Sequence, residues 1–394
     1  MSVTSRLYYD DPTLLAFTAT VLACEPAGQH YRVSLDRTAF YPTSGGQPHD
    51  LGHLREGDRV VPVIDVADED EQVWHLVAQA IAPGTHVAGE IDAARRHTHR
   101  QQHSGQHILS AAFDALFENR TESVHLGPGA CTLDLQREVT ADQCRRAEDY
   151  ANAAVWGNRP VTVRYADASD LASEPRLRKA TTRTGRIRLI DIAGHDLSAC
   201  GGTHVAATGE VGLIVIRGVE RFRGGTRVSF VAGQLALESY RELRNSADAA
   251  ARALSVPIDD VPVALARLHD DLKHEQRRAR ELGEQLNAIQ AQALESRVDG
   301  SGLLVAHLPD ADPHSLRLTA SHLVSAAGRV VALLGGASPH ALVVARSADR
   351  VDVDAGALVR TICAAHGGKG GGRPDLAQAG GVSASPDALR AFFG

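Results

Sequence analysis

Three histidines spaced four residues apart are the first residues in this chain that could carry chemistry. His99, His103 and His107 would share one face of a helix, because residues three and four apart are neighbours on a helix surface. The apolar residues that follow, from Ile108 to Leu116, keep helical spacing and predict that helix. Two imidazoles at this spacing can bind one metal ion. Taken alone, the run is equally consistent with a polar surface helix.

A second short motif, Cys200-Gly-Gly-Thr-His204, adds a thiol and an imidazole on a turn. Zinc favours mixed sulfur and nitrogen ligands, and the two glycines allow the backbone to wrap closely. By itself this motif could be a buried thiol beside a turn, but with the histidine pair it completes a set of four ligands. The site is not of the HExxH metalloprotease type, because Ser104 follows His103.

The helices and strands that are expected around these residues indicate an α+β protein. We expect a small β-barrel over residues 1–90, an α+β zinc-containing domain over 91–233, a helical hairpin or coiled-coil linker over 234–297, and an α/β domain over 298–394. The long helical segment breaks near Val256-Pro257, which favours a hairpin over a coiled-coil dimer contact. Further helices and strands are expected at Ala141–Trp156, Ala16–Cys24, Tyr31–Ala39, Val161–Tyr165, Arg186–Ile192, Val211–Ile216, Leu303–His307, Val330–Leu334 and Ala341–Ala345.

The composition is that of a folded protein of two or three domains. The chain has 394 residues, 43% of them hydrophobic and 23% charged, with a net charge of −7. Five cysteines without a secretory signal argue against a disulfide framework. No apolar run is long enough to span a membrane, so we predict a cytoplasmic protein. Only three lysines are present, so any contacts to phosphate must come mostly from arginine.

Four motifs in order carry a family resemblance. The segments YPTSGGQPHDLG, HSGQH, CGGTH and GGKGGGRPDLAQAGG resemble an alanyl-tRNA synthetase that lacks its front half. The chain is therefore similar to the free-standing alanyl-tRNA editing proteins of the AlaX type, in the long form that ends in a DHHA1 domain. The resemblance covers nearly the whole chain. No segment before residue 90 is long enough for a class II synthetase core, so we do not expect the chain to charge tRNA.

The resemblance implies that one zinc ion per chain is bound, and that His99 is a neighbour rather than a ligand. Four protein ligands normally mark a closed, structural zinc site. Catalysis therefore needs a displaceable ligand, an expanded coordination shell, or a metal that only positions the substrate. The sequence does not choose among these, and it does not identify the group that activates water. The implied ligands are His103, His107, Cys200 and His204.

The glycine turn and the basic residues supply the predicted contacts to substrate. In the family the threonine at the position of Thr43 is associated with recognition of the serine hydroxyl. Alanine has no hydroxyl to pair with this threonine, so tRNA that is correctly charged with alanine would be spared. Ser44 stands where many relatives carry a third glycine, and an ordinary turn is the alternative. The basic segment before Asp191 also includes Arg186 and Arg188, and a solvated hairpin face is its alternative. We predict substrate contacts at Thr43, Gly45, Gly46 and Gln47, and tRNA contacts at Arg176, Arg178, Lys179, Arg183, Lys369 and Arg373.

The leading hypothesis is a hydrolase that deacylates mischarged tRNA(Ala), chiefly seryl-tRNA(Ala) and next glycyl-tRNA(Ala). The first alternative is a non-catalytic tRNA-binding protein that has kept a structural zinc. The second alternative is a zinc hydrolase for another ester or a nucleotide. A homodimer through the helical or C-terminal region is a further prediction.

Overall fold

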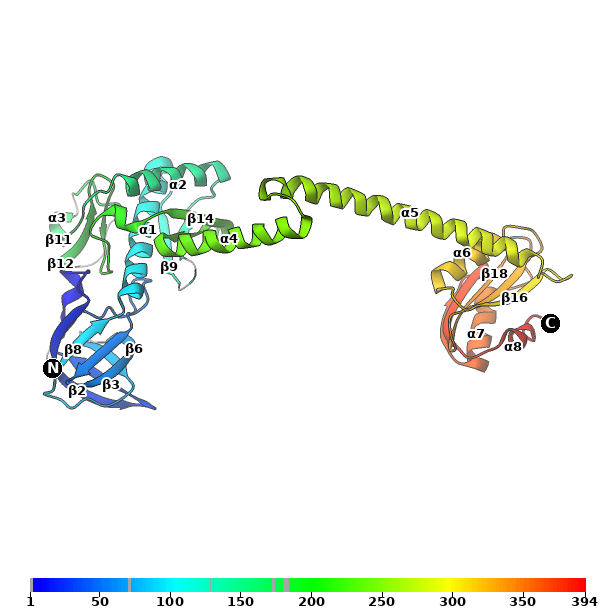
Figure 1. The fold of residues 1–394 in the computed structure, drawn as a ribbon, viewed down its shortest axis with the longest axis horizontal. Helices are drawn as coiled ribbons and strands as arrows, with labels where there is room; N and C mark the ends of the chain where they lie inside the picture. Colours follow the sequence, from blue (N-terminus) through cyan, green and yellow to red (C-terminus); the bar gives the residue numbers. More distant parts are fainter. Residues whose placement is uncertain (1–2, 70–71, 128, 130, 172–173, 180–183) are drawn as a thin grey trace. The chain divides into compact units, whose positions relative to one another are not determined.

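The computed structural model describes residues 3–69, 72–127, 129, 131–171, 174–179 and 184–394 (Figure 1). The chain divides into two compact units, Met1–Asp248 and Ala249–Gly394. Both units combine helices and sheets, which confirms the predicted α+β class. The bounds of the four predicted domains stay predictions. None of the described helices combines the length and the hydropathy needed to cross a membrane.

The first unit begins with the predicted β-barrel, which is closed by antiparallel pairing in the order β2-β3-β7-β6-β5-β8. Strand β2 alternates buried Phe17, Ala19 and Val21 with more exposed residues, as a strand with one face on a core must. Strands β1 (Ser5–Arg6) and β4 (Arg37–Thr38) form a separate parallel pair. The barrel strands are β2 (Ala16–Ala27), β3 (His30–Leu35), β5 (Gly52–Glu56), β6 (Arg59–Glu69), β7 (Gln72–Val77) and β8 (His86–Ile91).

Helix α1 (Ala93–Phe117) leads out of the barrel and carries the histidine run. Asp92 caps its first turn by accepting a hydrogen bond from the backbone N–H of Arg95. From Arg100 to Phe113 every residue is buried, so this helix is the centre of its domain rather than a surface helix. A Cβ at Gly105 would lie 2.9 Å from the Cβ of Ala232, so the glycine lets α1 pack closely on strand β15.

Two sheets and helix α2 (Ala141–Trp156) surround α1. The capping box of Thr140 and Gln143 fixes the start of α2. The apolar side of α1 packs with these elements in one core that includes Ile108, Phe113 and Phe230. One sheet has the order β14-β15-β10-β9 and the other β11-β12-β13. Their strands are β9 (Thr121–Leu126), β10 (Cys131–Leu135), β11 (Val161–Asp167), β12 (Arg186–Ile192), β13 (Asp196–Ala199), β14 (Ile214–Phe222) and β15 (Gly225–Ala232), and helix α3 spans Ala168–Leu171.

The long helical segment predicted over 234–297 is two helices, α4 (Gly233–Leu254) and α5 (Val261–Glu295). The break lies at the predicted place: Ser255 has a positive φ of 55°, and Pro257 precedes a short 3₁₀ turn, Ile258–Asp260. The apolar stripe of α5, including Leu265, Leu272 and Leu286, is exposed. The antiparallel pairing of the two helices and the dimer contact both stay predictions.

The C-terminal domain is a five-stranded sheet with the order β16-β17-β18-β20-β19. Residues of β17 alternate between two cores, Val331 and Leu333 facing α6 and Ala332 and Leu334 facing α7, so the sheet is covered on both sides. The three strands predicted here are confirmed to within one or two residues. The elements are β16 (Leu303–Leu308), α6 (Pro313–Leu323), β17 (Val330–Gly335), β18 (His340–Arg346), α7 (Ala355–His366), β19 (Lys369–Gly372), β20 (Leu376–Val382) and α8 (Pro386–Arg390).

Candidate metal centre

The fold brings the two predicted half-sites together into one buried cluster. His103, His107, Cys200 and His204 each offer one ligand atom, and these four atoms all lie within 4.8 Å of one another. The Cys200 Sγ is 3.3 Å from the Nε2 of His103 and 3.4 Å from the Nε2 of His204. One sulfur and three nitrogens at such distances are a donor set that suits a tetrahedral ion such as zinc.

The turn that carries Cys200 is held against α1 by a close backbone approach and a buried arginine. A Cβ at Gly202 would lie only 2.1 Å from the Cε1 of His103, so glycine is required for this contact. Arg188 donates from Nη1 to the carbonyl oxygens of Cys200 and Gly202, at 2.7 and 3.0 Å. Arg188 was expected to belong to an RNA-facing stripe, but it is buried and supports the metal turn instead.

Each histidine of the cluster makes a second hydrogen bond through Nδ1. The Nδ1 of His103 lies 2.8 Å from the Gln47 Oε1, and that of His107 lies 3.0 Å from the Asp196 Oδ2. The Nδ1 of His204 lies 3.1 Å from the Ser104 Oγ. The Gln47 and Asp196 oxygens accept from Nδ1 and therefore leave Nε2 of His103 and His107 available to a metal, whereas the Ser104 hydroxyl can donate to or accept from His204. This pattern, together with the burial of the cluster, is the structural reason that a metal fits here.

The groups around Cys200 shift the pKa values of the cluster. Burial raises the pKa of the Cys200 thiol, but the imidazoles of His103 and His204 outweigh it and lower this pKa well below its ordinary value. Burial lowers the pKa of His107, yet its hydrogen bonds to Asp196 and Cys200 raise that pKa to about 9. In the absence of a metal these shifts favour a Cys200 thiolate beside a protonated His107.

Metal affinity is expected to rise with pH because one of the ligands must lose a proton. His107 is protonated below a pKa of about 9, and its Nε2 must be free to bind. Between about pH 6 and pH 8 the apparent zinc affinity should increase by roughly tenfold per pH unit, as expected for the release of one proton. Competition with a chelator at several pH values, corrected for the chelator's own protonation, measures this slope. An affinity that is independent of pH over this range would contradict the assignment.

Asp196 is the carboxylate that orients His107, and sequence reasoning missed it. It is almost fully buried, accepts hydrogen bonds from Ser198 and from the Arg178 Nε at 2.7 Å, and lies on β13 close to the metal turn. Burial raises the pKa of Asp196, but His107 and Arg178 lower it far below its ordinary value, so the carboxylate stays charged. A carboxylate behind a metal-binding histidine fixes the ring and increases its basicity.

Asp196→Asn is expected to weaken zinc binding by about 10- to 100-fold, because His107 loses its charged partner. Asp191→Asn is the matched control, since Asp191 is also a nearly buried carboxylate held by two arginines, Arg164 and Arg176, but does not touch the cluster. Zinc affinity of the two variants and the wild type is compared by chelator competition. Equal affinities for the two variants would show that Asp196 has no special role.

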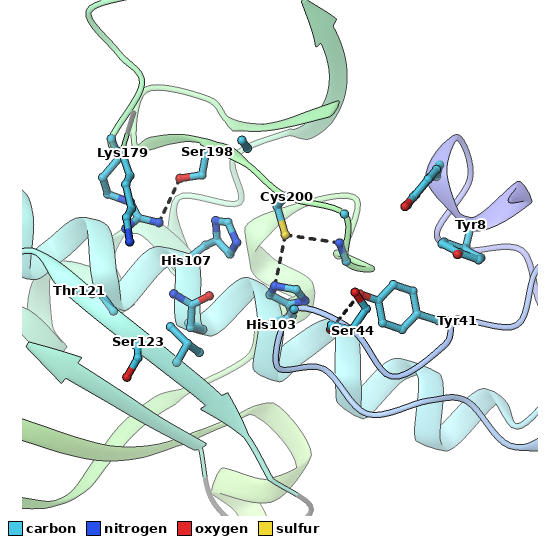
Figure 2. Close-up of a pocket in the computed structure, with 18 of the residues that line it drawn as sticks. Tyr8, Tyr41, Ser44, His103, His107, Thr121, Ser123, Lys179, Ser198 and Cys200 are labelled. Atoms are coloured by element: carbon cyan, nitrogen blue, oxygen red, sulfur yellow. Dashed lines mark hydrogen bonds between the residues drawn. The ribbon is translucent and has the colours of Figure 1, made fainter. Parts of the chain in front are cut away.

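A pocket of about 480 Å³ opens directly over the cluster (Figure 2). Tyr8, Tyr41 and Ser44 stand at one end, and Lys179 and Ser198 stand at the other, with His103, His107 and Cys200 between them. Tyr9, which is half-buried, also lines the pocket and lies over the guanidinium of Arg188. The tyrosines were not predicted as site residues. The sequence signals for them are the pair Tyr8-Tyr9 near the start of the chain and Tyr41, which begins the motif YPTSGGQPHDLG.

Only some residues of the turn that was predicted to bind substrate line the pocket. Gly45 lines the pocket together with Ser44. Thr43 is exposed and its hydroxyl bonds to His49, at 3.0 Å from the ring Nδ1. Gly46 accepts a hydrogen bond from the backbone of Leu126, and Gln47 is fully buried behind His103. Among the residues described, Thr43, Gly46 and Gln47 are not part of this pocket's lining, and the assignment of the turn to substrate binding stays a prediction.

The predicted tRNA contacts are mostly occupied by carboxylates of the same chain. Arg176 binds Asp191 at 2.5 Å, and Arg178 binds Asp196. Lys179 is exposed and lines the pocket. In the C-terminal unit, Lys369 is exposed on β19, and Arg373 binds Asp375 at 3.0 Å. Arg183 lies outside the described residues. His99 is half-buried and is not a member of the four-residue cluster.

Three family models match parts of the chain. The model for class II (A) tRNA synthetases matches residues 8–95, and the model for the second additional domain of threonyl and alanyl tRNA synthetases matches residues 187–229. The DHHA1 domain model matches residues 300–393. The chain is thus built from domains that are found in aminoacyl-tRNA synthetases.

Over nearly its whole length the chain is similar to part of alanine–tRNA ligases, the proteins that the four sequence motifs resemble. The alanine–tRNA ligase of Halorubrum lacusprofundi is 34% identical over 99% of this chain and 44% of its own length. That of Halobacterium salinarum is 36% identical over 98% of this chain and 43% of its own length. The chain therefore spans less than half the length of these relatives. Among solved structures, the C-Ala domain from Aquifex aeolicus alanyl-tRNA synthetase is 29% identical to this chain, with a TM-score of 0.21. The match covers 23% of this chain and 85% of the C-Ala chain.

Proposed function

We propose that this chain is a zinc-dependent deacylase that removes a wrongly attached amino acid from tRNA(Ala), chiefly serine and next glycine. The observation that carries the proposal is the cluster of His103, His107, Cys200 and His204, because three of its members, His103, His107 and Cys200, line an open pocket. This cluster lies in a chain that is homologous to alanine–tRNA ligases over nearly its whole length. A purely structural metal would not need a pocket of this size beside it.

The pocket offers the chemical groups that an aminoacyl ester requires. Hydroxyl groups of Tyr41, Ser44 and Thr121 are near the cluster and can hydrogen-bond the polar parts of a small amino acid. The half-buried ring of Tyr9 provides an aromatic surface for the terminal base of the tRNA. Lys179 at the other end can contact a phosphate. These residues would hold the ester over the floor of the pocket.

Zinc, when bound, would supply Lewis-acid chemistry by polarising the ester carbonyl or by activating water. The three imidazoles hold their positions through Gln47, Asp196 and Ser104, so the ligand set is rigid before any substrate arrives. Cys200 is the half-buried member of the four and borders the pocket, so we infer that it is the ligand most accessible to exchange. The tyrosine side of the pocket would exclude bulk water from the reacting ester.

Deacylation of three charged forms of tRNA(Ala) tests this function. We expect metal-loaded protein to release serine from seryl-tRNA(Ala) at least about 100-fold faster than alanine from alanyl-tRNA(Ala), because a hydroxyl partner inside the pocket is satisfied only by serine. Glycyl-tRNA(Ala) should fall between them. Seryl-tRNA(Ser) serves as the control for recognition of the tRNA. Each assay is run with the zinc content of the protein measured in parallel.

The same assay separates the competing functions. No deacylation by zinc-loaded protein that binds tRNA would overturn the proposal in favour of a non-catalytic tRNA-binding protein. Cleavage of small activated esters by protein that ignores charged tRNA would indicate a hydrolase for another substrate.

The proposal also includes a cytoplasmic location and a homodimer formed through α5 or the C-terminal domain. The apolar stripe of α5 is exposed, which supports a contact through that helix.

A further inference from the structure

The turn Ser44–Gln47 projects from the barrel into the α+β region. Two backbone hydrogen bonds close it, from the Ser44 N–H to the Gln47 carbonyl and from the Gln47 N–H to the Ser44 carbonyl. Gly45 and Gly46 have φ values of +58° and +87°, which other residues rarely adopt. The Gly46 carbonyl accepts from the backbone N–H of Leu126 at 3.2 Å, so the turn is docked on strand β9.

The Gln47 side chain is buried completely and is held between two parts of the metal centre. Its Oε1 lies 2.8 Å from the His103 Nδ1 and accepts from the Thr203 backbone N–H at 3.1 Å. Its Nε2 donates to the Thr203 Oγ1 at 2.9 Å. One residue of the barrel thus touches a metal-binding histidine and the turn that carries the other two ligands, Cys200 and His204.

These contacts determine both the amide orientation and the tautomer of His103. A backbone N–H only donates, so the Gln47 atom that faces the backbone N–H of Thr203 must be the amide oxygen. An amide oxygen only accepts, so the His103 Nδ1 beside it must carry the proton. The neutral ring then has its lone pair on Nε2, the atom that faces Cys200.

We propose that Gln47 is a positioning residue of the metal centre, through which the barrel orients His103 and sets its tautomer. Sequence reasoning placed Gln47 against the substrate, but its complete burial and its two partners support the role behind the metal. Asp196 does the same for His107 from strand β13, while the Ser104 hydroxyl contacts the His204 Nδ1 without fixing its tautomer. The inference concerns metal retention and does not depend on the proposed deacylation.

Zinc release from Gln47 variants tests this role without an activity assay. In Gln47→Met the side chain keeps its length but cannot accept from His103, so zinc transfer to a chromogenic chelator should be about 10- to 100-fold faster than in the wild type. In Gln47→Glu a carboxylate still accepts from His103, and the Thr203 hydroxyl can rotate to donate to it. We therefore expect Gln47→Glu to retain zinc within about threefold of the wild type.

Gln101→Met is the matched control for the loss of a buried glutamine. Gln101 is nearly buried on α1 and makes two hydrogen bonds, to the backbone of Glu210 and Gln234, without touching a metal ligand. Its zinc release should equal that of the wild type. The cobalt-substituted proteins add a spectroscopic comparison, in which Gln47→Met should shift the cobalt absorption bands and Gln101→Met should not. Equal release rates and equal spectra for these two variants would overturn the proposal.

A measurement on the wild type keeps the test decisive if Gln47→Met does not fold. In zinc-loaded protein labelled with ¹⁵N-histidine, the ring of His103 should have a protonated Nδ1 and a metal-bound Nε2. His103→Gln identifies its signal by difference. A His103 ring that binds zinc through Nδ1 would also overturn the proposal, since the Gln47 oxygen would then have no proton to accept.

Discussion

Cys200→Ala is expected to hold almost no zinc and to lose deacylation of seryl-tRNA(Ala) by at least about 1,000-fold. The Cys200 thiolate is the single anionic ligand of the cluster and lies within 3.4 Å of the Nε2 atoms of His103 and His204. Its removal leaves three imidazoles around a buried space, with no anionic ligand to balance a divalent cation. The fold should persist, because Cys200 lies on a turn and only packs against the edge of the hydrophobic core.

Zinc content and deacylation are measured on the same preparations of wild type and variant. Cys24→Ala is the control, since Cys24 is also a half-buried free cysteine but lies on barrel strand β2. It should keep both zinc and activity. A Cys200→Ala protein with a full equivalent of zinc and wild-type activity would show that the metal centre is not at this cluster. A variant that keeps zinc but loses activity would instead place Cys200 in the reaction itself.

Arg96→Met is expected to lower the free energy of unfolding of the first unit by about 3–5 kcal/mol. Arg96 and Asp50 are both fully buried, and the guanidinium Nη2 lies 2.5 Å from the carboxylate Oδ2. Arg96 also donates to the carbonyl oxygens of Pro12 and Ala39, so it joins α1 to the barrel. Without it, the charge of Asp50 and two buried carbonyls lose their partner.

Urea unfolding followed by tryptophan fluorescence measures this change in the first unit alone. The chain has two tryptophans, Trp74 and Trp156, and both lie in that unit. Arg217→Met is the control, since Arg217 is exposed on β14 of the same unit and should change the stability by less than about 0.5 kcal/mol. The double variant Arg96→Met/Asp50→Asn should recover part of the loss, because the unpaired charge is then removed. Equal unfolding curves for Arg96→Met and the control would contradict the role of this pair.

Local patterns in the sequence were sufficient to predict the main elements. Helical spacing predicted α1, Pro257 predicted the break between α4 and α5, and runs of β-branched and apolar residues predicted the barrel strands β2 and β3 and the buried strands β16, β17 and β18. These signals depend on residues a few positions apart, which is the range over which backbone geometry repeats. Pairing of α4 with α5 would depend on contacts between residues far apart in the chain, so the spacing of apolar residues within each helix does not predict it.

Local patterns were less informative about the surroundings of the site. Arg176 and Arg178 looked like a basic stripe, but each faces a carboxylate, Asp191 or Asp196, that only folding brings opposite. Thr43 was expected to meet the substrate, whereas its hydroxyl bonds to His49. Tyr8 and Tyr9 were not expected in the pocket, because the 3₁₀ turn Leu7–Tyr9 lies far along the chain from the histidines, and Tyr41 was not predicted although it begins the motif of the glycine turn.

The sequence by itself determined which residues could bind a metal, because each half-site is a short motif whose two ligands are four residues apart. Only the tertiary structure decided that the halves meet, since His103 and Cys200 are 97 residues apart and their approach depends on the packing of α1 against the sheets. It also decided the partners of the ligands: Gln47 comes from the barrel, 56 residues from His103, and Asp196 is 89 residues from His107. Ligand identity is a property of side-chain chemistry, whereas ligand orientation depends on contacts that exist only after the chain has packed.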